Sequence, residues 1–194
     1  MSFGSTSWAA DITWLGATGS WDDPSQWSGG EVPGTNGHAI INGGTVTADG
    51  PVKIDGLTLT GGTLTGSGDV LISGAVEWLD GAFRGAGMVV IESGAVAHWS
   101  RMADKRIASP MDNAGTVNWD EGKFVVESAE FNNLGEFNVA HDGQVQHGGR
   151  TPAFNNQMKQ PDDVEQDQRR DGEFSQRAAQ QHGSDQCRRD YFSQ

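Results

Sequence analysis

Short apolar runs bounded by glycines dominate the chain between residues 45 and 149. Residues 45–47, 57–60, 70–72 and 88–91 are rich in Val, Ile, Leu and Thr, and glycines stand near the ends of these runs. Short runs of β-branched and apolar residues between turn residues are typical of β-strands. No segment keeps apolar residues three or four positions apart for long enough to predict an amphipathic helix. The pattern therefore predicts an all-β structure of short strands.

Sequence repetition indicates how these strands are arranged. The string GSGDVLISGAVEW at 66–78 matches GAGMVVIESGAVAHW at 85–99, with one residue inserted before and one after the shared SGAV. The string DNAGTV at 112–117 recurs as NNLGEF at 132–137. A step of roughly 20 residues is typical of solenoids, in which each repeat makes one turn of the chain.

A repeat of this length cannot bury its own apolar face. Stacked repeats would place each strand about 4.8 Å from its equivalent on the next turn, and the inward Val, Leu, Ile and Phe side chains would form one column. We therefore predict a parallel β-solenoid, most simply a right-handed β-helix. An antiparallel β-sandwich also contains many short strands and is the alternative, although its strands do not repeat in sequence.

The sequence changes character after Gln157. A third copy of the phrase that reads DNAGTV and then NNLGEF begins at Asn155-Asn156 and continues as QMKQP, where the two earlier copies have a glycine and then a strand. Residues 158–194 are rich in Gln, Asp and Arg, so we expect a disordered tail. A change of reading frame near Gln157 is a second explanation, which translation of the gene in its other frames would test. The predicted division is a Trp-rich cap at 1–44, solenoid repeats at 45–157 and the tail at 158–194.

Composition narrows the class of partner. The 194-residue chain has 28 glycines, a formal net charge of -13 and a pI near 4.5. An acidic chain is a poor ligand for a phosphate backbone, so no nucleic-acid partner is expected. No apolar run approaches the roughly 20 residues that span a bilayer, and the first residues do not resemble a signal peptide. The single cysteine, Cys187, has no partner for an internal disulfide.

The most specific string is TWLGATGSWDDPSQWSGGEVP at residues 13–33. Its pattern, W-x-G-x-x-G-x-W-x-D-P-x-x-W-x-x-G-x-V-P, resembles the segment that begins the β-helical repeats of bacterial autotransporter-like passengers and other secreted surface repeat proteins. The residues that carry the resemblance are Trp14, Gly16, Gly19, Trp21, Asp23, Pro24, Trp27, Gly30, Val32 and Pro33.

This resemblance implies a β-helix that lies outside the cell or on the bacterial surface. It also implies a non-catalytic structural or adhesive role, with surface glycans or other cell-surface proteins as partners. The turn that follows the pattern, GTNGH at residues 34–38, departs from the family because it has no carboxylate. Since Ca²⁺ needs oxygen ligands such as carboxylates, no calcium site is expected there.

The tryptophans near the start have two interpretations. The end of a solenoid exposes an apolar core, and bulky aromatic side chains can cover it as an amino-terminal cap. The residues available for such a cap are Trp8, Trp14, Trp21 and Trp27. Alternatively, a carbohydrate-binding platform consists of Trp14, Trp21, Trp27 and Asp23, with indole faces that stack on sugar rings and a carboxylate that binds hydroxyl groups.

Three later tryptophans, Trp78, Trp99 and Trp119, follow strands at equivalent positions of the repeat. They form either an outward aromatic ladder on one face or an inward ladder within the core. The sequence leaves both arrangements open.

Candidate catalytic groups are few. Glu77, Glu92 and Asp120 are the carboxylates considered for glycoside hydrolysis, although an acidic solenoid brings carboxylates together without catalysis. The basic string RMADKR at 101–106 interrupts the repeats and is expected to be a solvated loop, although a polysaccharide lyase would use such a group as its base. The histidines lack the spacing of a metal motif.

We therefore predict no catalytic residue, no metal site and no cofactor. The predicted function is a non-catalytic structural or adhesive segment, and the alternative is a carbohydrate-binding or polysaccharide-degrading β-helix. Because the last predicted turn has nothing beyond it to cover its strands, end-to-end self-association is also expected.

Overall fold

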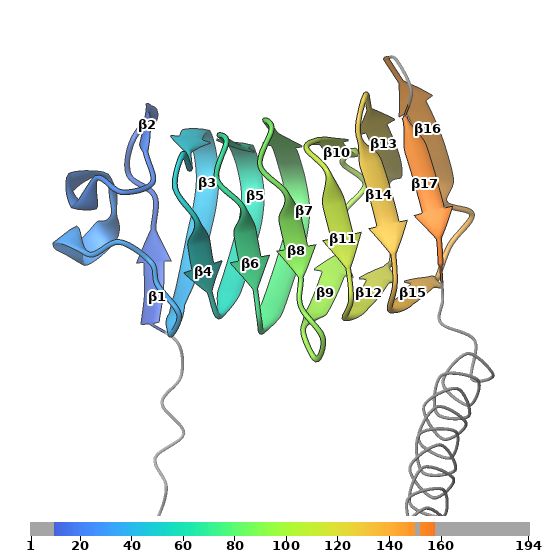
Figure 1. Cartoon of the computed structure of the whole chain (residues 1–194), viewed down its shortest axis with the longest axis horizontal. Helices are drawn as coiled ribbons and strands as arrows, with labels where there is room; N and C mark the ends of the chain where they lie inside the picture. The colour runs from blue at the N-terminus through green and yellow to red at the C-terminus, as the bar shows by residue number, and fades with distance from the viewer. Residues whose placement is uncertain (1–9, 150–151, 158–194) are drawn as a thin grey trace, which may run out of the picture. The chain divides into compact units, whose positions relative to one another are not determined.

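The computed structural model describes residues 10–149 and 152–157, which form a parallel β-solenoid with almost no helix (Figure 1). This confirms the predicted fold class and excludes the antiparallel sandwich. Residues 1–9, which include Trp8, lie outside the described residues. The predicted disordered tail at 158–194 also lies outside them.

Each complete turn has three straight segments, which we call the first, second and third arms. First-arm strands are β1 (Ala10–Thr13), the starts of β3 (Gly37–Thr47), β5 (Gly56–Thr65) and β7 (Ala75–Arg84), and then β9 (Val96–Trp99), β12 (Thr116–Trp119) and β15 (Glu136–Val139). Second-arm strands are β2 (Thr18–Ser20), the ends of β3, β5 and β7, and then β10 (Lys105–Ala108), β13 (Lys123–Glu127) and β16 (Gln144–Gly148). Third-arm strands are β4 (Val52–Ile54), β6 (Val70–Ile72), β8 (Val89–Ile91), β11 (Met111–Asn113), β14 (Glu130–Asn133) and β17 (Ala153–Asn156).

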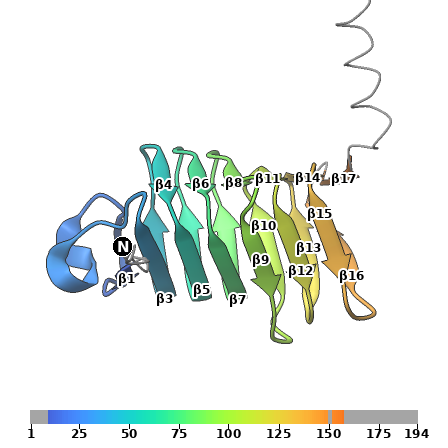
Figure 2. The same cartoon turned by 90° about the horizontal axis from the view of Figure 1, so that it is seen from below.

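The arms of successive turns pair side by side in parallel. Across the described residues, the first and second arms form one eleven-stranded sheet, because β3, β5 and β7 pass through the bend between these arms. The third arms form a separate six-stranded sheet (Figure 2). Residues at equivalent positions pair directly from turn to turn, as Leu57 does with Val76 and Val76 does with Ala97. The repeat in the sequence is therefore a repeat in space.

Glycines make the bend between the first and second arms possible. Gly62 in β5 has a φ of 79°, a left-handed conformation that side chains other than glycine rarely adopt. A Cβ at Gly62 would lie 2.6 Å from the carbonyl carbon of Gly43, the bend residue of the previous turn. Both the conformation and the close stacking of the bends require glycine here.

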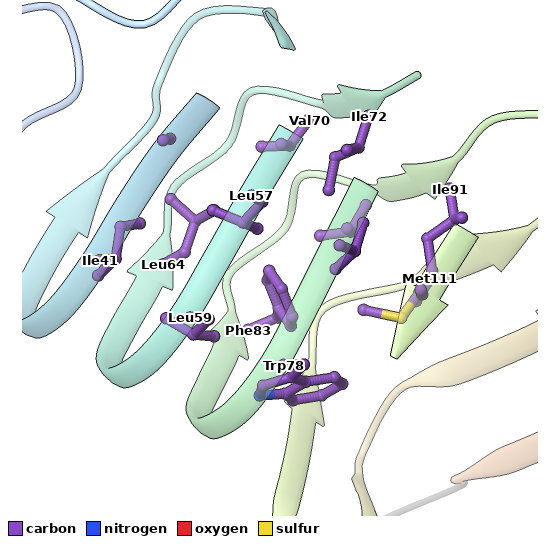
Figure 3. Close-up of a cluster of buried hydrophobic side chains, with 14 of the residues drawn as sticks. Ile41, Leu57, Leu59, Leu64, Val70, Ile72, Trp78, Phe83, Ile91 and Met111 are labelled. Carbon is purple, nitrogen blue, oxygen red and sulfur yellow. The ribbon is translucent and has the colours of Figure 1, made fainter. Parts of the chain in front are cut away.

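Alternate residues of each arm point inward and form continuous columns (Figure 3). One column runs through Ile41, Leu59, Trp78, Trp99 and Trp119, which pair in that order on five successive turns and are at most 1% exposed. The tryptophan ladder therefore faces the core, which decides the question that the sequence left open. This column changes from aliphatic side chains on β3 and β5 to tryptophan on β7, β9 and β12.

The solenoid begins before the predicted boundary at residue 44. Strand β1 pairs with the start of β3, and β2 pairs with its end, so the first turn already has two arms. The boundary at 44 lies inside β3. The early strands were not predicted because they are short and their sequences, ADIT and TGS, belong to no recognisable copy of the repeat.

Candidate functional site

Three of the four predicted cap tryptophans, Trp14, Trp21 and Trp27, come together at the amino-terminal turn. In place of a third arm, this turn has a loop with two short 3₁₀ turns, η1 (Pro24–Gln26) and η2 (Ser28–Gly30). The Trp27 ring contacts Trp14 and Trp21 edge to face, with centroid distances of 5.0 and 4.9 Å. Trp27 Nε1 also donates a 2.7 Å hydrogen bond to the backbone oxygen of Trp21. These contacts fold the loop over the first turn.

All three indoles are buried and continuous with the solenoid core. Trp14, Trp21 and Trp27 are 2%, 2% and 1% exposed. A ring that stacks on a sugar needs an open face, so this arrangement favours the cap over the platform. Carbohydrate binding by Trp14, Trp21, Asp23 and Trp27 stays a prediction that only binding measurements can test.

Asp23 positions the turn that carries Trp27. Its Oδ1 accepts hydrogen bonds from the Ser25 amide at 3.0 Å and from the Ser25 hydroxyl at 2.7 Å, as an N-cap residue does. These two hydrogen bonds, the hydroxyl one first, lower the pKa of Asp23 below its ordinary value. The Asp23 carboxylate is therefore engaged in hydrogen bonds that hold the loop.

Two glycines of the opening pattern make room for Trp14. A Cβ at Gly16 would overlap Gln26 Oε1 and lie 2.9 Å from Trp14 Cζ2, and a Cβ at Gly19 would lie 3.2 Å from Trp14 Cη2. Neither glycine has a left-handed φ, so close approach and not backbone conformation requires them. The W-x-G-x-x-G part of the pattern thus describes an indole packed against two glycines.

A group of charged side chains lies on the outer surface of the second arms. Glu127 accepts 2.9 Å contacts from Arg84 and from Arg106, and Arg106 also contacts Asp104 at 2.7 Å. The hydrogen bond to Glu127 is the main cause that raises the pKa of Arg106. The group joins β7, β10 and β13, which are successive neighbours in the sheet. Its charges are paired with each other, which indicates a structural role.

The expectation of a solvated loop at 101–106 is wrong for its last two residues, Lys105 and Arg106, which begin β10. Lys105 is fully buried, and its Nζ donates hydrogen bonds to the carbonyl oxygens of Arg101 at 2.8 Å and Ala103 at 2.9 Å. Burial lowers the pKa of Lys105, against the opposing effect of Asp80, Glu121 and Asp104. An amine without exposed surface cannot meet a polymeric substrate, so Lys105 does not fit the role of a lyase base.

The carboxylates considered for glycoside hydrolysis are on different parts of the turn. Glu77 faces outward on β7, where its neighbours in register are Thr58 and His98. Glu92 follows β8 and Asp120 follows β12, strands that belong to different arms. Among residues 10–149 and 152–157, no three His, Cys, Asp or Glu side chains gather closely enough to hold a metal ion.

A row of polar side chains on the first arms was not predicted from the sequence. Its members occupy the same outward position on five successive turns and are partly or fully exposed: Thr58, Glu77, His98, Asn118 and Asn138. We call this set the polar row. Successive members are about 4.8 Å apart, the distance between paired strands. The row offers hydroxyl, carboxylate, imidazole and amide groups along a line.

A hollow opens beside β1 at the amino-terminal turn, lined by Ala10, Ile12, Glu31, Val32 and residues 34–37. Its only ionisable side chain among the described residues is Glu31, so it offers no acid–base pair. In the described part of the chain, no helix is long and apolar enough to cross a membrane. Comparison of the chain with protein-family models, curated proteins and solved structures gave no match.

Proposed function

We propose that the chain is a non-catalytic structural segment, a stiff spacer within a secreted or bacterial-surface protein. The observation that carries this proposal is the parallel pairing of the first arms from the first described turn to the last, in which the register shifts lie at the bends of β3, β5 and β7. In a solenoid each turn contacts only its neighbours, so stiffness depends on how well every interface between turns is held. Strand pairing continues through every described turn, and the side chains of the core are buried up to the turn before the last.

Asparagine ladders hold the last three turns together. Asn113 Nδ2 donates to Asn133 Oδ1 in the interior, and Asn133 Nδ2 donates to Oδ1 of the exposed Asn156, both at 2.7 Å. Asn113 Nδ2 also donates to the Glu136 backbone oxygen at 2.9 Å, and Asn133 Nδ2 donates to that of Gly135 at 3.1 Å. Buried amides with several partners fix the spacing of the turns. This supports a spacer better than a mobile binding loop.

The location on a cell surface and the adhesive role rest on the resemblance of the opening pattern. Surface glycans and other cell-surface proteins are the proposed partners. Antibodies against the chain are expected to label intact cells of the source organism as strongly as permeabilised cells. Labelling that requires permeabilisation would contradict the proposed location.

The polar row favours a second candidate function, carbohydrate binding. An extended glycan could lie along the row and exchange hydrogen bonds with one side chain per turn. This candidate places the ligand on β5, β7, β9, β12 and β15, away from the buried tryptophans.

A glycan array, with a reducing-end assay on the same glycans, separates these functions. The spacer proposal expects neither binding nor new reducing ends. Binding that is lost in His98→Ala and kept in Lys53→Ala, an exposed residue of β4 on another face, would establish the second candidate. New reducing ends would contradict the non-catalytic assignment.

A further inference from the structure

The two ends of the described solenoid differ. At the amino-terminal turn, the buried Trp14, Trp21 and Trp27 cover the core. At the last turn, Val139 and Val145 are 48% and 38% exposed, although both stand at core positions. Val139 pairs with Trp119 and Val145 with Phe124, which are buried on the turn before. Their exposure therefore marks an open end of the core.

The strands of the last turn are open as well. Within the described residues, β15 pairs only with β12, β16 only with β13 and β17 only with β14. Their other edges present unpaired backbone groups, which favour the addition of another strand. The partly buried rings of Phe137 and Phe154 pack on the core from this end. An apolar centre surrounded by strand edges forms a surface that we call the end face.

The end face offers both a hydrogen-bond donor and an acceptor on β17. Asn156 uses its Oδ1 to accept from Asn133, which leaves its Nδ2 to donate. Asn155 uses its Nδ2 to donate to Asn132 Oδ1 at 2.9 Å, which leaves its Oδ1 to accept. A surface that carries both kinds of group can complement a copy of itself.

The distribution of charge also favours a second copy of the chain as the partner of the end face. The whole chain has a net charge of -13, yet β16 and β17 contain no Asp, Glu, Lys or Arg, and β15 contains one such residue, Glu136. Two copies can thus bring these strands together without like-charge repulsion. The cap at the other end carries Asp22, Asp23 and Glu31 and covers its core, so it is a poor partner for the end face.

We infer that the end face binds the end face of a second copy of this chain. A two-fold axis perpendicular to both the solenoid axis and β17 relates the copies, so their β17 strands meet antiparallel and Val139, Val145, Phe137 and Phe154 become buried. Each copy contributes the same surface, and the covered ends cannot extend the assembly, so the product is a closed dimer and not a fibre. The inference is independent of the proposed function.

Sedimentation velocity of the full chain over a wide range of concentration tests this inference. The wild-type chain is expected to show a reversible monomer–dimer equilibrium. Val145→Asp and Val139→Asp each place a carboxylate in the interface and are expected to raise the dimer Kd about tenfold or more. Two exposed apolar residues away from the end face serve as matched controls, Leu15→Asp at the cap and Met102→Asp in the β9–β10 loop, and neither should change Kd.

Three results would overturn the inference. The first is a chain that stays monomeric at every concentration, as it would if residues 158–194 covered the end face. In that case Val145→Asp would lower the melting temperature without any change of mass. The second is assembly beyond the dimer, and the third is an equal effect of Leu15→Asp and Val145→Asp. Thermal melts show whether each variant is folded. If Val145→Asp does not fold, the dimer Kd of Val139→Asp tests the inference instead.

Discussion

Trp78 and Trp99 occupy the same inward position on successive turns, and their rings meet edge to face with centroids 5.2 Å apart. Neither indole has exposed surface, and neither Nε1 has a hydrogen-bond partner among the described residues. The two side chains therefore stabilise the core through buried area and ring contacts, which offset the cost of an unpaired N–H.

Replacement of Trp99 by alanine is expected to lower the free energy of unfolding by about 3–5 kcal/mol. Trp99 lies at the centre of the aromatic core, where it also contacts Phe124, Phe131 and Phe137. Urea denaturation measures the loss. His98→Ala is the matched control, because His98 is the adjacent residue on the exposed face and should change stability by less than about 0.5 kcal/mol. Equal effects of the two substitutions would contradict the inward orientation.

Replacement of Trp21 by alanine tests the cap. Trp21 is buried against Trp27, so the change is expected to cost about 3–5 kcal/mol and to lower the melting temperature. Leu15→Ala, in the same segment but 65% exposed, should leave the melt nearly unchanged. If Trp21→Ala keeps the wild-type melting temperature and loses glycan binding instead, the capping role is wrong and the platform is right.

Replacement of Gly16 by alanine tests why the opening pattern contains glycine. The new methyl group would meet Gln26 and the Trp14 ring; the Gln26 side chain can turn away, but the ring is held in the core. We expect a loss of about 1–3 kcal/mol, typical of overpacking. Gly34→Ala is the control, since a Cβ there meets nothing within 4 Å. Calorimetric melts of both variants measure the melting temperature, which Gly16→Ala is expected to lower more than Gly34→Ala. Equal melting temperatures would contradict the close approach at Gly16.

The repeats made the fold predictable, because a stacked repeat is the arrangement that buries the apolar face of such short strands. The predicted strand at 70–72 has the bounds of β6. Inward and outward sides could not be assigned to Trp78, Trp99 and Trp119 from the sequence, since a tryptophan after a strand fits a core or a face equally well. In the structure, Trp78 pairs with Leu59 of the preceding turn, and this pairing places the tryptophan on the inward side.

Features that the type and spacing of neighbouring residues do not indicate were not predictable. Lys105 stands in a basic string, and such strings are normally solvated; only the fold shows that carbonyl groups of residues 101 and 103 surround its amine. The polar row also requires the register of β5 to β15, because its members are about 20 residues apart in the chain. Prediction of functional residues therefore failed where the sequence around a residue has no pattern that marks its role.

Lys105 should give the stability of the protein a distinctive pH dependence. Burial lowers its pKa in the folded chain below the ordinary value of 10.5, which the unfolded chain retains. Between these two pKa values the unfolded state holds a proton that the folded state has lost. An increase in pH through this window therefore favours the folded state.

The Lys105→Met protein lacks this titration and preserves an unbranched side chain in the core. The free energy of unfolding of the wild type minus that of Lys105→Met is expected to rise with pH through the window between the lowered pKa and 10.5. Urea denaturation of both proteins at a series of alkaline pH values measures the difference, in which the titration of all other groups cancels. A difference that stays flat, or falls, as the pH rises would show that the Lys105 amine is not held in a buried site.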